Sequence, residues 1–146
     1  MLFAACLLAA PSALAAPESG ADGGFLRAVN AARASVGLQP VELDPTLARA
    51  ARSHTLEMLQ ADEFSHSDFG RRMAAFNVRG SMMGENLAWG SGPYGAVGAI
   101  VREWLASPGH RANLLRPGYK RIGIGVARGT FQGYDGATIV TADFAG

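Results

Sequence analysis

The sequence has one cysteine, Cys6, and one lysine, Lys120, among its 146 residues. Cys6 lies in the apolar stretch at the start of the chain, so everything after it is free of thiols. That absence excludes a disulfide, a cysteine nucleophile and a cysteine-ligated metal from the rest of the chain. About 130 residues are enough to fold by burying apolar side chains, so such a domain needs no disulfide.

The sequence also lacks a strong charge of either sign. Its 13 Lys and Arg residues nearly balance 12 Asp and Glu residues, and no basic block stands out. This composition argues against a nucleic acid as partner. No later run is long enough for a transmembrane segment, and we expect a monomer.

The first 16 residues are apolar and end in small residues, Ala13-Leu14-Ala15-Ala16. This pattern is typical of a secretory signal peptide, although no basic residue precedes the apolar run. We therefore predict signal-peptide residues 1–16, a disordered lead-in at 17–23 and a single domain at 24–146. The expected location is periplasmic or extracellular, and cleavage would remove Cys6.

Apolar periodicity predicts helices in the first two thirds of the domain. Phe25, Val29, Ala32 and Val36 recur at helical spacing, and Gly37 is a typical stop. Asp44 is a good N-cap for a second helix, because Pro45 can occupy the first helical position. A short helix is expected at about residues 69–77.

The remaining elements are a fourth helix and two strands. Pro93 is expected to open the helix and Pro108-Gly109 to end it. Glu85 is expected in a loop that leads into a short extended piece. Alternation predicts strands at 120–129 and 137–145, which should pair antiparallel across a turn-rich connection. Helices followed by a strand pair favour an α+β fold.

Histidine is scarce, so each of the three can be considered separately. His54 lies on the buried stripe of the second helix and is predicted to be a core residue. His66 and His110 are expected in loops, where functional side chains are common. Two acidic residues have similar settings: Glu85 follows Gly84 directly, and Glu103 lies about one helical turn before Ser107.

Two imidazoles and two carboxylates support several kinds of chemistry. His66, His110, Glu85 and Glu103 could bind a divalent cation such as Zn²⁺ or Mg²⁺. The same groups could instead transfer protons, clamp a ligand, or tie loops to helices in a structural network. No HExxH motif is present, which argues against a zincin-type protease. These alternatives stay open on spacing alone.

Several segments resemble one family when they are read in order. They are "VNAARASVGLQPVELDPTLARAARSH" (29–54), "HSDFG" (66–70), "GENLAWG" (84–90), "EWLASPGHRANLL" (103–115) and "RIGIGVA" (121–127). Together they resemble the CAP superfamily, whose SCP domain occurs in cysteine-rich secretory, antigen 5 and pathogenesis-related proteins. The resemblance covers nearly all of residues 24–145 and is closest to bacterial members without disulfides.

The resemblance implies a three-layer α-β-α sandwich with a central cleft. In that family two histidines and two acids line the cleft, and His66, Glu85 and His110 match three of them. The second acid of long members falls at Ser107 here, so Glu103, one turn earlier, is the candidate substitute. Asn86 is expected to support the segment that aims Glu85.

Three functions remain open because the fold does not fix an activity. The first is a secreted binding module whose cleft holds a small, lipid-like or extended peptide ligand. The second is a hydrolase in which His66 or His110 is the general base and Glu85 orients it. Ser65 and Ser67 are the nearest serines, but neither lies in a G-x-S-x-G elbow. The third is a scaffold that acts through surface contacts.

Overall fold

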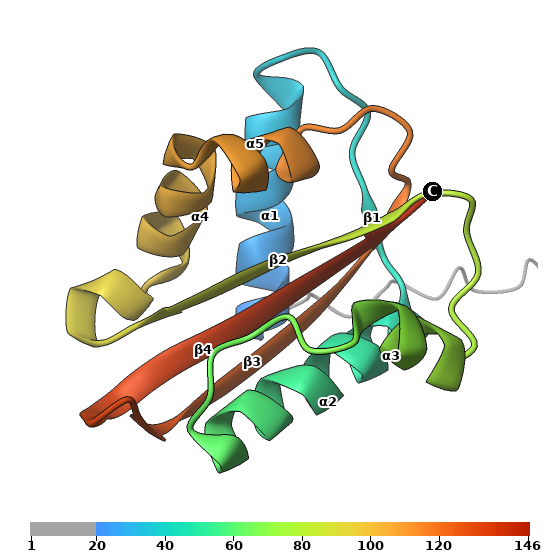
Figure 1. Ribbon diagram of the computed structural model, residues 1–146. Helices are drawn as coiled ribbons and strands as arrows, with labels where there is room; N and C mark the ends of the chain where they lie inside the picture. The colour runs from blue at the N-terminus through green and yellow to red at the C-terminus, as the bar shows by residue number, and fades with distance from the viewer. Residues whose placement is uncertain (1–19) are drawn as a thin grey trace, which may run out of the picture.

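The computed structural model describes residues 20–146. The predicted signal peptide and the first part of the predicted lead-in lie outside the described residues. Among the described residues, no helix has the length and hydropathy needed to cross a bilayer. The elements, drawn in Figure 1, are α1 (Ala21–Ala34), β1 (Glu42–Leu43), α2 (Pro45–Ala61), α3 (Phe69–Ala75), β2 (Met83–Gly90), the 3₁₀ helix η1 (Gly92–Gly95), α4 (Val97–Ala106), α5 (Pro108–Leu114), β3 (Arg121–Phe131) and β4 (Tyr134–Ala145).

One four-stranded sheet, in the order β1-β3-β4-β2, forms the middle of the molecule. The short β1 runs parallel to β3, and the other two pairings are antiparallel. The predicted β3–β4 pair is confirmed, but both strands are longer than predicted. Their connection is tight because Gln132 (φ 51°) and Gly133 (φ 80°) both adopt the left-handed conformation that such hairpins favour.

Helices cover both faces of this sheet, which confirms the predicted α+β, three-layer α-β-α sandwich (Figure 1). One face packs against α1, α4 and α5 through a core that includes Phe25, Trp104 and Phe144. The opposite face packs against α2 and α3 through two smaller clusters. Alternation along β4 therefore assigns each side chain to one layer.

Two glycines of β3 explain how closely α2 approaches the sheet. A Cβ atom on Gly123 would lie 2.1 Å from the carbonyl carbon of Leu47, and one on Gly125 would lie 2.5 Å from that of Ala51. The helix backbone thus rests directly on the strand, which only glycine permits. The alternating glycines of "RIGIGVA" are the residues against which α2 packs.

The first helix differs from the prediction at both ends. Residues 21–23, predicted as disordered lead-in, belong to α1. The negative charge of Asp22, in the first turn, stabilises the helix because it lies at the positive end of the helix dipole. The helix ends at Ala34, so Val36 lies outside it and is 50% exposed. Val36 therefore does not continue the buried stripe.

Two prolines also act differently from the prediction. Pro93 lies in η1, and α4 begins only at Val97. Pro108 does not end the helical region: α4 ends at Ala106, and Pro108 is the first residue of α5. Ser107 between them is extended (ψ 121°), as the residue before proline usually is. The break is therefore one residue long, and His110 lies on a helix rather than in a loop.

Candidate functional site

Glu85 lies on a strand rather than in the predicted loop. It is the third residue of β2, at the edge of the sheet, and it pairs in register with Asp143 of β4. The ladder continues through Gly84 and Met83, so the strand begins before the acid. The "GEN" segment is therefore held by backbone pairing along its whole length.

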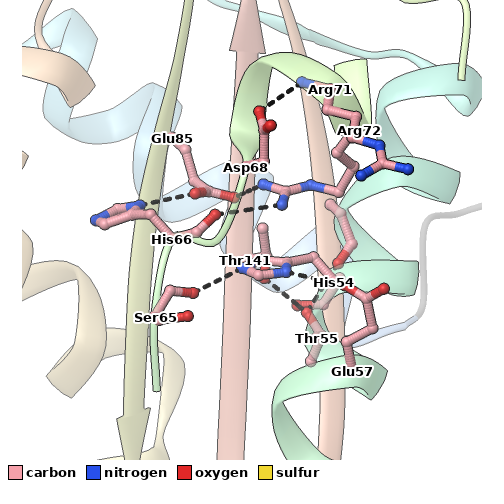
Figure 2. A network of polar contacts seen from close by, with 12 residues as sticks. His54, Thr55, Glu57, Ser65, His66, Asp68, Arg71, Arg72, Glu85 and Thr141 are labelled. Atoms are coloured by element: carbon pink, nitrogen blue, oxygen red, sulfur yellow. Dashed lines mark hydrogen bonds and ion pairs between the residues drawn. The ribbon is translucent and has the colours of Figure 1, made fainter. Parts of the chain in front are cut away.

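Two side chains from the α2 and α3 side of the sheet bind the Glu85 carboxylate (Figure 2). His66 Nδ1 lies 2.7 Å from Glu85 Oε1, and Arg72 Nη2 donates to Oε2. Because a carboxylate can only accept, Nδ1 of His66 carries the hydrogen and Nε2 is the free nitrogen. The Glu85 side chain is only 3% exposed, whereas that of His66 is 58% exposed. A buried carboxylate thus orients an accessible imidazole.

Arg72 reaches this position because a short helix aims it. Asp68 caps α3 by accepting a hydrogen bond from the backbone N–H of Arg71 at 2.9 Å. The guanidinium of Arg72 also donates to the backbone oxygen of His66 at 3.4 Å and lies 5.5 Å from the ring centroid of Phe69. Arg72 therefore holds both the side chain of Glu85 and the backbone of His66.

A second buried carboxyl, Asp143, lies beside Glu85 and was not identified in the sequence. It is fully buried, and neither oxygen has a hydrogen-bond partner. Burial, followed by the nearby charge of Glu85, raises the pKa of Asp143 to about 8, although Arg72 acts in the opposite direction. Asp143 is therefore predominantly protonated at neutral pH. The sequence did carry one sign of this buried carboxyl: an acidic residue lies within the otherwise apolar strand "ATIVTADFA".

The loop that carries His66 is fixed by His54. Nε2 of His54 donates to the backbone oxygen of Ser65 at 2.9 Å, and Nδ1 lies 3.4 Å from a carboxylate oxygen of Glu57. His54 is 1% exposed, as predicted for a core residue. Its contact with Ser65 holds the chain directly before His66.

His110 lies on the other side of β2. Its backbone oxygen accepts a hydrogen bond from Asn86 Nδ2 at 3.0 Å, and Asn113 Nδ2 donates to Asn86 Oδ1 at 3.1 Å. Tyr119 completes this network through a 2.7 Å bond from its hydroxyl to Asn113 Oδ1. Asn86 therefore anchors α5 to β2, the strand that carries Glu85, and its side chain lies on the opposite face of that strand from the side chain of Glu85.

The imidazole of His110 is electrostatically linked to two predicted site residues. Its Nδ1 is buried and has no hydrogen-bond partner. Burial lowers the pKa of His110, His66 lowers it further, and Glu103 raises it. His110 is therefore neutral at pH 7, and both His66 and Glu103 act on it through their charge. Glu103 itself is exposed on α4.

The arrangement of these groups does not fit a divalent cation. Among residues 20–146, no group of three or more His, Cys, Asp or Glu side chains is arranged to hold a metal ion. Both Glu85 oxygens have partners, one of them the positively charged Arg72. His66 and Glu85 are in direct contact. His110 is linked to His66 and to Glu103 only through charge. We call His66, Arg72, Glu85, His110 and Asp143 the β2 site.

Two hollows lie beside the loop that carries His66. One, of about 530 Å³, is lined by His54, Glu57, Met58, Gln60, Ala61, Glu63, Ser65 and Ser67. The other, of about 340 Å³, shares Glu57 and Ser67 with the first and also includes Arg72. Both are open to solvent, and Arg72 links the second one to the β2 site.

The sequence and the structure match known proteins of one family. The profile of the cysteine-rich secretory protein (CAP) family matches residues 26–144. The chain is 32% identical over 121 residues to YkwD, an uncharacterized Bacillus subtilis protein, covering 80% of this chain and 44% of YkwD. It is 33% identical over 106 residues to pathogenesis-related protein 1 of Arabidopsis thaliana, covering 71% of this chain and 58% of that one.

A solved structure shows the same fold. An extracellular SCP-domain protein from Bacillus anthracis superposes with a TM-score of 0.67 at 27% identity, covering 85% of this chain and 41% of that protein. The chain thus spans less than two thirds of the length of these relatives. The matched profile covers most of the sequence, so the chain belongs to the CAP family, as its motifs indicated.

Proposed function

We propose that this protein is a secreted binding module that uses the β2 site to hold a small, lipid-like or extended peptide ligand. The observation that carries the proposal is the His66–Glu85 contact. A buried carboxylate fixes one nitrogen of an imidazole that is itself 58% exposed. The other nitrogen is left to meet a ligand in a fixed direction, which lowers the entropic cost of binding.

Two further observations support a ligand site at this edge of the sheet. His110 has a buried nitrogen without a partner. Open hollows of about 530 and 340 Å³ flank the loop that carries His66. These volumes are in the range that small-molecule sites occupy. Export is supported by the predicted signal peptide and by the likeness to an extracellular Bacillus anthracis protein.

The test is a titration followed by NMR signals of the three imidazole rings. The probes are dodecanoate, lysophosphatidylcholine below its critical micelle concentration, and tetraalanine. We expect at least one probe to shift the ring signals of both His66 and His110. His54 lines the larger hollow, so its signal reports on occupancy of that hollow. The control is the indole N–H of Trp104, which is 1% exposed, donates to the backbone oxygen of Leu87 and should stay unchanged. Equal shifts at Trp104 and the two site histidines, or none with any probe at millimolar concentration, would contradict the proposal.

A hydrolase is the second candidate, because the His66–Glu85 pair has the geometry of a general base and its orienting acid. No serine hydroxyl is bonded to His66 among the described residues, so water is the attacking group in this alternative. Steady hydrolysis of a peptide or ester panel, abolished in Glu85→Gln with an unchanged circular dichroism spectrum, would establish it. Absence of turnover over hours would exclude it for those substrates.

A further inference from the structure

We propose that the guanidinium of Arg72 is the resident cation of the β2 site: it excludes divalent metals from Glu85, and its removal would free the facing carboxylates of Glu85 and Asp143 to bind one. The inference rests on the proposed function only in assigning ligand binding to this site. It assigns Arg72 a role that no motif of the sequence predicted.

Arg72 occupies the place on Glu85 that a metal ion would take. Its Nη2 binds Oε2 of Glu85, the oxygen that His66 leaves free, so the carboxylate is already shared between two donors. The side chain of Arg72 is 7% exposed and that of Glu85 is 3% exposed. Water cannot screen this pair well, so a metal ion entering beside Arg72 would meet a strongly repelling charge. Removing one partner of a buried pair also carries a large cost.

Two carboxyl groups lie together next to Arg72. Glu85 and Asp143 are opposite each other on neighbouring antiparallel strands, where Cβ atoms are about 4.5–5.5 Å apart. Both Asp143 oxygens are without a hydrogen-bond partner. Carboxylate oxygens are suitable ligands for Zn²⁺. Glu85 and Asp143 thus offer two facing carboxylates, and Arg72 occupies an oxygen of one of them.

The contacts of Arg72 also explain why it stays in place. It donates to the His66 backbone as well as to Glu85, and it packs against Phe69. A metal ion that displaced it would break all three contacts at once. The guanidinium forms all three contacts from a single side chain.

The experiment is calorimetric titration of the full chain with Zn²⁺ near neutral pH. The variants are Arg72→Met, Arg72→Lys as the matched control that keeps the positive charge, and Arg72→Met combined with Glu85→Gln or with Asp143→Asn. Arg72→Met is expected to bind Zn²⁺ roughly 10-fold or more tightly than wild type, and each added substitution to weaken that binding again. Arg72→Lys is expected to behave like wild type.

Two results would overturn the inference. One is Zn²⁺ binding by wild type that Glu85→Gln abolishes, because Arg72 would then not exclude the metal. The other is an Arg72→Met protein, folded by circular dichroism, that binds no more tightly than wild type. If Arg72→Met does not fold, Arg72→Gln, which keeps a hydrogen-bond donor beside Glu85 without the charge, replaces it in the same titration with the same expected gain. The organic probes report on ligand binding separately, so failure of one proposal is distinguishable from failure of the other.

Discussion

Glu85 and Asp143 are opposite each other across the β2–β4 ladder, and both carboxyl groups are buried on the face covered by α2 and α3. Arg72 supplies a positive charge to the pair, and it binds Glu85. Two ionised carboxylates in this position would repel each other, so one of the two stays protonated and neutral. Asp143, which has no donor, is the one that keeps its proton.

Asp143→Asn is expected to stabilise the protein more as the pH rises. The folded state keeps the Asp143 proton up to a pH of about 8, whereas the unfolded chain releases it near 3.8. The contribution of Asp143 to the free energy of unfolding therefore falls between those values. Asparagine has no proton to lose, so the Tm difference between variant and wild type should widen from about pH 5 to about pH 8.

The control is Asp135→Asn, on the same strand but exposed. Its Tm should follow wild type at every pH in the same thermal-unfolding series. A Tm difference for Asp143→Asn that stays constant across the series would mean that Asp143 is ionised in the folded protein.

The pKa of His110 should respond in opposite directions to its two charged neighbours. His66→Ala removes the like charge, so the pKa of His110 should rise towards 6.5, and Glu103→Gln removes the opposite charge, so it should fall further. Because folding lowers this pKa, the stability that His110 contributes is lost as the pH falls below about 6.5. NMR titration of the His110 ring measures both shifts.

Glu42→Gln, on β1 at the far edge of the sheet from β2, is the control for these titrations. It should leave the His110 titration unchanged. Shifts of the same sign in both site variants would show that His66 and Glu103 do not act on His110 through charge.

Local patterns in the sequence predicted much of the fold, and the structure confirms them. Asp44 caps α2 through bonds to the N–H groups of Thr46 and Leu47, as the Asp-Pro sequence predicted. The alternation of Ile122 and Ile124 with glycine correctly predicted a strand with one apolar face. Patterns of this kind are set by nearest neighbours, so a single sequence reveals them.

Features that depend on distant contacts were missed. Pro108 taken by itself predicts the end of a helix, yet it starts α5. Asn86, on a strand 24 positions before His110, anchors that helix. Asp143 and Arg72 come next to Glu85 only through the β2–β4 pairing and the placement of α3. Nothing in the separate segments "GRRMAA" and "TADFA" shows that they meet.

Arg33→Met is expected to destabilise the protein by about 3 kcal/mol, because several buried carbonyl groups would lose their donor. The guanidinium of Arg33, 1% exposed, donates to the backbone oxygens of Gln39, Leu114, Arg116 and Tyr119. It thereby joins α1 to α5 and to the segment after it. Urea unfolding measures the loss, and exposed Arg52→Met should change stability by less than about 0.5 kcal/mol. Similar midpoints for the two variants would contradict this role.

Gly123→Ala is expected to cost about 3 kcal/mol or more in the free energy of unfolding, because the added methyl group would force α2 away from the sheet. Its Cβ would lie 2.1 Å from the carbonyl carbon of Leu47 and 2.3 Å from the backbone nitrogen of Ala48, and backbone atoms cannot rotate aside. Gly109→Ala is the matched control: its Cβ would meet nothing within 4 Å, and it lies in α5. Alanine suits a helix better than glycine, so this control should be neutral or stabilising by up to about 1 kcal/mol. Chemical denaturation of both variants compares them, and equal effects would show that α2 does not rest on the β3 backbone.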